Sequence, residues 1–279
     1  MALILDGKKV AESVCSKIVL EVSLLPVVPK IVFIMVGDNA ASATYVRSKT
    51  KKSQDLGLRS QTVHLPTETS QEELIALLHD LNRDKDVTGI LVQLPLPSHF
   101  DETKVLREID PMKDVDGLHP DNMGRLFSGD PRFVACTPAG ILEILKFHSI
   151  PIAGSKVVVV GRSNIVGKPV AQLMLMNDAT VTICHSKTRN LDKETSAADI
   201  LIVAMGKPKF IGSAHVKEGA TVIDVGIHRL GDRLVGDVDF ESVEKKASAI
   251  TPVPGGVGPM TIAMLMKNLV GAAALRAKG

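Results

Sequence analysis

Hydrophobic residues follow two patterns along the first half of the chain. At helical spacing they predict helices, and in short apolar or β-branched runs they predict strands. The predicted helices cover residues 8–24, 40–57 and 70–82, and the predicted strands cover residues 30–37, 59–65 and 88–94. Because strands and helices alternate, this part of the chain predicts a parallel sheet with helices on both faces.

A region of weaker periodicity follows at residues 95–138. Its prolines, its glycines and the acidic run KDVDG at 113–117 predict loops and short helices on an exposed or functional surface. Thr137 and Pro138 predict the start of the next helix, with the threonine as N-cap and the proline at the first helical position. We therefore place a domain boundary here.

The second half of the chain repeats the alternation, with short apolar strands typical of a Rossmann-like doubly wound parallel sheet. These strands are predicted at 156–160, 180–184, 199–205 and 221–226. The final helix is expected to pack back on the first domain. The predicted fold class is α/β, with two domains and a cleft between them: residues 1–137 with helix 258–279, and residues 138–257.

Composition and charge restrict the function. A chain of 279 residues has room for about two domains. The net charge of +2 is spread over interspersed residues, so no basic stripe indicates nucleic-acid binding. The three cysteines lie far apart without C-x-x-C spacing, which predicts buried thiols in a reducing cytoplasm. We see neither a signal-peptide core nor an apolar run near the ~18 residues of a membrane span, so we expect a soluble protein.

The stretch KVVVVGRSNIVGKP at 156–169 is the clearest ligand signal. Its four valines predict a strand buried on both faces, which continues through Gly161, a short polar turn and Gly167 into a helix. Backbone N–H groups and the positive end of that helix can hold a phosphate. The fingerprint G-x-G-x-x-G is incomplete, since Ser163 and Asn164 occupy the middle of the turn. An ordinary strand-to-helix turn without a ligand stays open as an alternative.

The strand after this turn indicates which nucleotide would bind. NAD sites usually carry a carboxylate about 20 residues after the glycine turn, where it binds the ribose 2′-hydroxyl. Here the strand TVTIC is followed by HSKTR at 185–189, which has no carboxylate. Hydroxyls and cations, with Arg162 in the turn itself, favour the 2′-phosphate of NADP.

Tyr45 and Lys49 are four residues apart on one face of a predicted helix, so they could act on a substrate together. A lysine partly desolvated beside an aromatic ring has a lowered pKa and can serve as a general acid or base. The alternative is a solvated basic face. Y-x-x-x-K also occurs in short-chain dehydrogenases, but there it follows the glycine turn on the same domain, whereas here it precedes the turn.

Other polar residues lie at strand ends and in loops. Gln93 ends a predicted buried strand, where ligand sites of α/β proteins form, although it could equally satisfy loop backbone. Asp114 and Asp116 could bind a metal, orient a ring nitrogen or cap a turn, and the turn is the default interpretation. No cluster of histidine, cysteine and carboxylate at ligand spacing predicts a metal site.

Together these segments resemble the bacterial bifunctional methylenetetrahydrofolate dehydrogenase/methenyltetrahydrofolate cyclohydrolases. The resemblance covers nearly the whole chain, and its order and spacing are more specific than any single glycine motif. It is carried by LDGK at 5–8, the helix with Tyr45 and Lys49, VQLPLP at 92–97, DVDGLHPDNMGRL at 114–126, CTPAG at 136–140, GRSNIVGKP at 161–169, CHSKT at 184–188 and PVPGGVGPMT at 252–261. One departure is Ala135, where the family more often has proline; it touches the linker and nothing catalytic.

The resemblance implies oxidation of 5,10-methylenetetrahydrofolate with NADP, hydrolysis of the methenyl product to 10-formyltetrahydrofolate, and a homodimer. Lys49 would be the catalytic acid/base, and Gln93 would hydrogen-bond to it and tune it. Tyr45 would stack on the folate, and Asp116 would bind the polar edge of the pterin. The residues implied to bind NADP are Gly161, Arg162, Ser163, Ile165 and Ser186, with Arg162 and Ser186 on the 2′-phosphate. At the cleft, Pro254, Gly255 and Gly256 would let the backbone approach the ligand closely.

Two other functions stay open at this point. One is an NADP-dependent dehydrogenase of another small acid, of the shikimate or malic type. The other is a nucleotide-binding regulatory module without turnover, which would leave Lys49, Gln93 and Asp116 unexplained.

Overall fold

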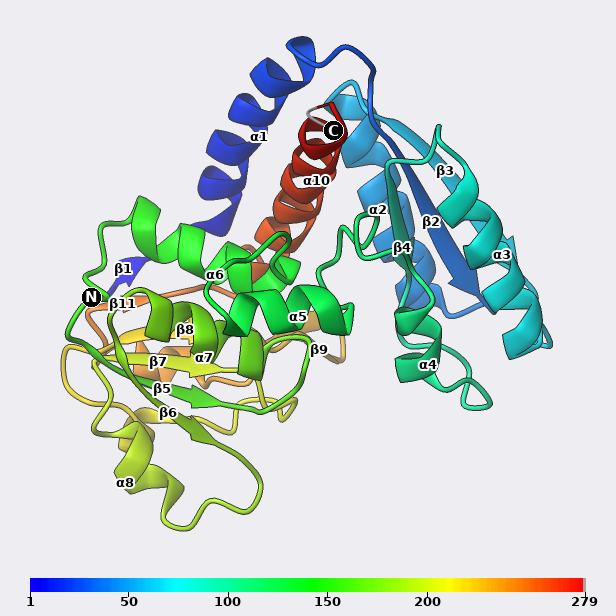
Figure 1. Ribbon diagram of the computed structural model, residues 1–279. Helices are drawn as coiled ribbons and strands as arrows, with labels where there is room; N and C mark the ends of the chain where they lie inside the picture. Colours follow the sequence, from blue (N-terminus) through cyan, green and yellow to red (C-terminus); the bar gives the residue numbers. More distant parts are fainter. Residues whose placement is uncertain (278–279) are drawn as a thin grey trace. The chain divides into compact units, whose positions relative to one another are not determined.

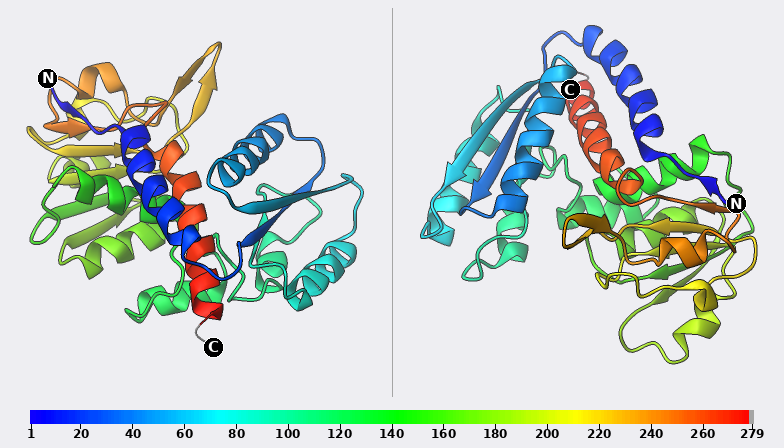
Figure 2. Two further views of the ribbon diagram at one scale, coloured as in Figure 1. Left: turned by 90° about the horizontal axis from the view of Figure 1, so that it is seen from above. Right: turned by 180° about the vertical axis from the view of Figure 1, so that it is seen from behind.

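The computed structural model describes residues 1–277, and the chain divides into two compact units. Unit 1 comprises Met1–Ser13 and Ala135–Met264, and unit 2 comprises Val14–Val134 and the chain from Leu265 onward. Two long helices, α1 (Gly7–Ser23) and α10 (Val257–Arg276), begin in unit 1 and end in unit 2. Their carboxyl-terminal halves lie side by side within unit 2 (Figures 1 and 2).

Unit 2 is built on a three-stranded parallel sheet in the order β3-β2-β4. Its strands are β2 (Lys30–Val36), β3 (Arg59–Leu65) and β4 (Gly89–Val92), and its helices α2 (Ala40–Asp55), α3 (Gln71–Arg83), α4 (Glu102–Arg107) and α5 (Pro120–Phe127). The chain crosses in opposite directions in its two β-α-β connections. Helices α2 and α3 therefore cover opposite faces of the sheet (Figure 1).

The helices of unit 2 begin where the sequence supplies side-chain caps. The side chain of Asn39 accepts the N–H of Ser42 at the start of α2. Ser70 and Glu73 form the predicted capping box of α3, which is confirmed. Strand β2 is buried along Ile31–Val36 because it is central and covered on both faces.

Unit 1 is built on a six-stranded parallel sheet in the order β1-β11-β8-β7-β5-β6. The strands are β1 (Leu3–Ile4), β5 (Lys156–Val160), β6 (Thr180–Cys184), β7 (Ile200–Val203), β8 (Thr221–Asp224) and β11 (Ala249–Ile250). The helices are α6 (Cys136–Phe147), α7 (Gly167–Met176), α8 (Leu191–Thr195), the short 3-10 helix η1 (Ser213–His215) and α9 (Phe240–Val243). In addition, β9 (His228–Leu230) pairs with β10 (Arg233–Val235) in a separate antiparallel hairpin.

The doubly wound fold is confirmed, and its winding reverses at β5. From β5 the chain moves outward to β6 at one edge and then back past β5 to β7 and β8. The four valines of β5 are fully buried because sheet neighbours flank the strand on both sides. Such a reversal leaves a crevice outside the carboxyl ends of β5 and β7, where ligands of this fold class bind.

One local prediction, the position at which the helix after Ala135 begins, is wrong. Helix α6 begins at Cys136 with Ala135 at its N-cap position and no side-chain cap, so Thr137 lies inside the helix and its hydroxyl is 2.9 Å from that of Thr261. Proline is tolerated throughout a first helical turn, where its missing N–H has no intrahelical acceptor, and its position therefore does not fix the start.

Helix α10 is long and apolar enough to span a membrane by length and composition, but half of its most apolar window is buried inside the protein.

The amino-terminal residues pack in unit 1, together with residues 135–264. Strand β1 pairs in parallel with β11, joining Leu3 to Ala249, so residues 1–13 form part of unit 1. A two-residue strand carries no periodicity in the sequence, and its partner lies more than two hundred residues away. The domain ranges 1–137 with 258–279 and 138–257 stay a prediction.

Candidate active site

The two predicted catalytic residues Lys49 and Gln93 are joined by a hydrogen bond in unit 2. The Nζ of Lys49 donates to the Oε1 of Gln93 at 3.0 Å. Lys49 is buried on α2, with 7% of its surface exposed, so the alternative of a solvated basic face is wrong for this residue. Gln93 follows β4, and its Nε2 donates to the carbonyl of Leu94 at 2.6 Å. That second bond fixes the amide so that its oxygen faces the lysine.

Tyr45 lies one helical turn before Lys49 on α2 and is 38% exposed. Desolvation by burial raises the pKa of its hydroxyl above the usual 10.0, so the ring stays neutral at physiological pH. An exposed neutral aromatic ring beside a buried lysine offers a flat apolar surface to a planar ligand.

The loop that carries Asp116 is held by its neighbour Asp114. The carboxylate of Asp114 accepts the N–H groups of Leu118 at 3.2 Å and His119 at 2.8 Å, and also the Nδ2 of Asn122 at 2.8 Å. Asp114 is 2% exposed, and desolvation by burial raises its pKa. The default interpretation of Asp114 as a turn residue is therefore confirmed. Asp116 is half-buried in the turn that Asp114 organises.

In unit 1, the turn after β5 is shaped by backbone contacts. Gly161 has a φ of +136°, and a Cβ there would lie 2.2 Å from the carbonyl oxygen of Ala204, which follows β7. A Cβ on Gly167 would lie 2.1 Å from the carbonyl oxygen of Gly161. Both positions therefore require glycine, because the strand, the turn and the start of α7 meet at backbone distance.

The side chains of this turn divide into one helix cap and several exposed groups. The Oγ of Ser163 accepts the N–H groups of Val166 at 3.2 Å and Gly167 at 3.3 Å, so this serine satisfies the start of α7. Arg162 and Ile165 are exposed, Ile165 by 47%. A phosphate could reach the guanidinium of Arg162 without any rearrangement of buried groups.

The turn after β6 lies beside the glycine turn, since the N–H of Gly161 donates to the carbonyl of Cys184 at 2.9 Å. The Oγ1 of Thr188 accepts the N–H of His185 at 2.8 Å, and Nδ1 of His185 is 3.1 Å from the N–H of Lys187. These bonds close the turn and leave Ser186 exposed at its tip. The structure therefore brings the predicted cofactor residues at 161–165 and at Ser186 to neighbouring strand ends.

The PVPGG segment forms the turn before α10. The N–H of Gly7 donates to the carbonyl of Gly255 at 3.0 Å, and a Cβ on Gly7 would lie 1.8 Å from the carbonyl oxygen of Gly256. Gly255 has a φ of +104°, and Pro254 is exposed. Packing of this turn against the start of α1 is thus one physical reason for the glycines, and their contact with a ligand stays a prediction.

Asn122, which was not predicted from the sequence, is fully buried and donates to both the carboxylate of Asp114 and the carbonyl of Pro111. Its only signal was its place in the segment 114–126. Within residues 1–277, no group of three or more His, Cys, Asp or Glu side chains is arranged to hold a metal ion.

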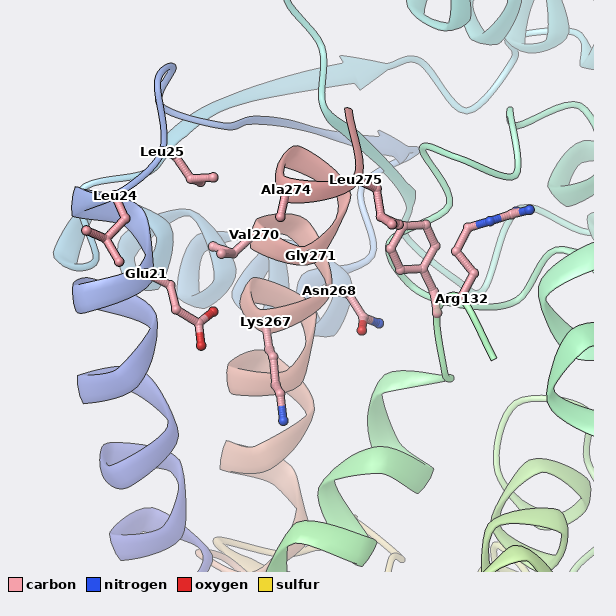
Figure 3. A pocket seen from close by; sticks show the side chains of 11 residues that line it. Glu21, Leu24, Leu25, Arg132, Lys267, Asn268, Val270, Gly271, Ala274 and Leu275 are labelled. Carbon is pink, nitrogen blue, oxygen red and sulfur yellow. The ribbon is translucent and has the colours of Figure 1, made fainter. Parts of the chain in front are cut away.

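Unit 2 also contains a cavity of about 570 Å³ between the ends of α1 and α10 and the segment 132–133 (Figure 3). It is lined mainly by apolar side chains, with Glu21 and Lys267 at one end. Neither Lys49 nor Gln93 lines it, so this cavity is separate from the candidate catalytic pair.

The fold and the two sets of residues define a class: a two-domain α/β enzyme with a dinucleotide-type crevice in one unit and a buried lysine in the other. Comparison with known families gives a narrower result. Residues 5–116 match the family model "Tetrahydrofolate dehydrogenase/cyclohydrolase, catalytic domain", and residues 135–277 match "Tetrahydrofolate dehydrogenase/cyclohydrolase, NAD(P)-binding domain". The chain belongs to the tetrahydrofolate dehydrogenase/cyclohydrolase family, and it is a bifunctional enzyme of that family.

Individual relatives agree along their full lengths. The "Bifunctional protein FolD" of Acetivibrio thermocellus is 54% identical and aligns over 99% of both chains. The crystal structure of the bifunctional FolD enzyme from Campylobacter jejuni superposes with a TM-score of 0.97 at 47% identity, over 99% of this chain and 100% of that one. A Trypanosoma brucei FolD structure, complexed with NADP cofactor and inhibitor, superposes with a TM-score of 0.96 at 39% identity, over 100% of this chain and 99% of that one.

Proposed function

We propose that this protein oxidises 5,10-methylenetetrahydrofolate to 5,10-methenyltetrahydrofolate with NADP and hydrolyses the product to 10-formyltetrahydrofolate. The observation that carries the proposal is the buried Lys49 bound to Gln93 in the part of the chain that matches the family's catalytic domain. This match supports the folate reaction over a dehydrogenase of the shikimate or malic type.

Lys49 performs the proton transfers of the hydrolysis. Water that adds to the methenyl carbon must lose a proton, and the nitrogen that leaves that carbon must gain one. A lysine amine can exchange both protons if it is held close to the carbon. Gln93 holds it, because its amide oxygen accepts from Nζ at 3.0 Å. Tyr45 stacks on the folate ring system, and Asp116 accepts hydrogen bonds from the polar edge of the pterin.

The residues at the strand ends of unit 1 fit NADP. When bound, this cofactor accepts a hydride from the methylene carbon. The turn between β5 and α7 ends at the amino terminus of a helix, where backbone N–H groups can hold a phosphate, while Ile165 offers an exposed apolar contact. Arg162 and Ser186 are exposed at neighbouring turns and bind the 2′-phosphate. The turn 185–189 has no carboxylate to accept the 2′-hydroxyl of NAD, which supports NADP as the preferred cofactor.

The test follows methenyl formation and decay by absorbance after addition of methylenetetrahydrofolate with NADP, and in parallel with NAD. We expect methenyl to form faster with NADP and then to decay by hydrolysis in the absence of further cofactor. Formation without decay would contradict the cyclohydrolase assignment. Reduction of NADP by a small acid such as shikimate or malate, with no reaction of the folate, would contradict the proposed function as a whole.

We further propose that the enzyme is a cytoplasmic homodimer. The reduced, buried state of its three cysteines supports the compartment. The edge strand β6 and the end of α7 expose Ile183, Leu175 and Met176, which supports association through unit 1. Light scattering coupled to size-exclusion chromatography should give twice the 29.8 kDa mass of one chain, and a single-chain mass at micromolar concentration would contradict the dimer.

A further inference from the structure

Asp237 is a fully buried carboxylate that none of the assigned roles uses. Its Oδ2 accepts the N–H groups of Met205 at 2.7 Å and Gly206 at 3.0 Å. Its Oδ1 accepts the N–H of Lys207 at 2.8 Å and lies 2.7 Å from the Nε2 of His228. Three consecutive backbone N–H groups thus converge on one carboxylate, which is how a protein backbone holds an anion.

The turn that Asp237 holds lies at the reversal point of the sheet. Residues 204–207 follow β7 directly, and β7 is the neighbour of β5 on the side where the winding reverses. The carbonyl oxygen of Ala204 is the atom that excludes a Cβ from Gly161. The turns after β5 and β7 are therefore two walls of the same crevice, and Asp237 fixes one of them from behind.

Asp237 is itself held in place by a second buried carboxylate, that of Asp224. Its own N–H donates to the Oδ1 of Asp224 at 2.9 Å, and Asp224 ends β8, the next strand of the sheet. The Oδ2 of Asp224 accepts the N–H of Val238 at 2.9 Å. Gly236 lies against this carboxylate, since a Cβ there would be 1.8 Å from the Oδ2 of Asp224. A rigid connection therefore runs from the end of β8 to the turn after β7.

Besides the carboxylate, this turn is held by Met205, which packs against the hydrophobic core of unit 1, and by the N–H of Lys209, which donates to the carbonyl of Gly236 at 2.9 Å. Gly206 has a φ of +71° and open space beside it, so no side-chain packing holds its left-handed conformation. Loss of the carboxylate would leave the N–H groups of three consecutive residues without their acceptor. The turn would then rearrange at the point where it borders the glycine turn.

We propose that Asp237 is a positioning residue for the nucleotide: its carboxylate fixes the Met205–Lys207 turn as the second wall of the cofactor crevice. This inference rests on the proposed function, since it assumes that NADP binds at the carboxyl ends of β5 and β7. Asp237 does not touch the cofactor. It acts through the backbone of residues 205–207, and the effect of its removal should appear in nucleotide affinity rather than in hydrolysis.

The test compares Asp237→Asn with a matched control at the opposite end of the same strands. Asp199 precedes β7, accepts the N–H of Lys156 at 2.8 Å and pairs with Lys217, so Asp199→Asn perturbs the same sheet away from the crevice. The Kd of NADPH is measured by its fluorescence, and hydrolysis of methenyltetrahydrofolate is measured without nucleotide. We expect Asp237→Asn to raise the Kd about tenfold or more and to change hydrolysis less than about twofold. Asp199→Asn should bind NADPH like the wild type.

His228→Ala serves if Asp237→Asn does not fold, because the His228 side chain is 22% exposed and makes one of the four contacts of the Asp237 carboxylate. It should weaken NADPH binding by a smaller factor, about threefold. Wild-type NADPH affinity in the folded variants, or a parallel loss of affinity and hydrolysis, would overturn the positioning role. Failure of the wild-type enzyme to bind NADPH would instead overturn the proposed function.

Discussion

The candidate site of unit 2 consists of side chains, whereas that of unit 1 consists mainly of backbone. In unit 2 a buried lysine and a glutamine meet at 3.0 Å, and the proposed reacting group is the lysine amine. In unit 1 the glycine turn is shaped by contacts at positions where no Cβ fits, and the buried carboxylates of Asp224 and Asp237 bind backbone N–H groups. Chemistry that moves protons needs an ionisable side chain, while phosphate recognition can use N–H groups alone.

This difference predicts that hydrolysis and nucleotide binding can be separated by mutation. The largest effect is expected at Lys49. Lys49→Met keeps the length of the side chain but removes the amine, so hydrolysis of methenyltetrahydrofolate should fall about 100–10,000-fold. Affinity for NADP should stay close to that of the wild type. Stopped-flow absorbance measures the first quantity and NADPH fluorescence the second.

The control for Lys49→Met is Lys51→Met on the same helix. Lys51 is 75% exposed and pairs with Asp55 at i, i+4, an interaction of small energetic weight. This variant should hydrolyse the substrate like the wild type. Near-normal hydrolysis by Lys49→Met would remove the acid/base role and, with it, the main contrast between the two units.

Gly161→Ala tests the backbone character of unit 1. The new Cβ would lie 2.2 Å from the carbonyl oxygen of Ala204 and would occupy a φ of +136°, so we expect a loss of about 3 kcal/mol in the free energy of unfolding. NADPH binding should weaken at least about tenfold. Urea denaturation and NADPH fluorescence give the two values. Gly154→Ala is the control, because Gly154 has a φ of +75° with nothing within 4 Å, and it should lose some stability but no affinity.

Most of the fold was accessible from the sequence because it depends on local patterns. The valines of β5 signal burial on both faces, and the capping box at Ser70 signals a helix start. Strand β1 was not accessible, since two residues show no periodicity and their partner Ala249 is remote in the chain. Lys49 and Gln93 were predicted individually from helix spacing and from a strand end, and the family resemblance implied their hydrogen bond, which the structure has at 3.0 Å.

Asp237 illustrates the part of the site that local sequence cannot give. Its three N–H donors lie 30–32 residues earlier, and the hairpin β9–β10 intervenes. Nothing in the residues around it distinguishes a buried anchor from an exposed turn carboxylate. The role of the buried carboxylates of unit 1 can therefore be recognised only from the three-dimensional structure.

The pH dependence of stability tests how unit 1 uses a buried charge. Burial raises the pKa of Asp224 from 3.8 to about 6, against the opposing effect of its N–H donors. Between these values the folded chain binds more protons than the unfolded chain, so the contribution of Asp224 to the free energy of unfolding decreases as the pH rises. From about pH 4 to about pH 7 this decrease should approach 3 kcal/mol, at about 1.4 kcal/mol per pKa unit.

Asp224→Asn isolates this effect from other carboxyl groups, because asparagine does not titrate. The free energy of unfolding of the wild type minus that of Asp224→Asn, from urea denaturation at each pH, should fall across this window. A difference that stays constant with pH would mean that the N–H donors offset burial, so that the pKa of Asp224 is the same in the folded and unfolded chains.

Arg162 sharpens the comparison, since it is a charged side chain in a turn whose shape is set by backbone contacts. The glycine turn offers the same N–H groups to NAD and to NADP, which differ only at the 2′-position. Arg162→Ala should therefore cost about 1.5–3 kcal/mol of NADP binding, as for a charge-assisted hydrogen bond, and little of NAD binding. Titration of both cofactors against the variant measures the two losses. Equal losses would mean that Arg162 contributes to the shared part of the site, and that discrimination lies with Ser186 and the turn after β6.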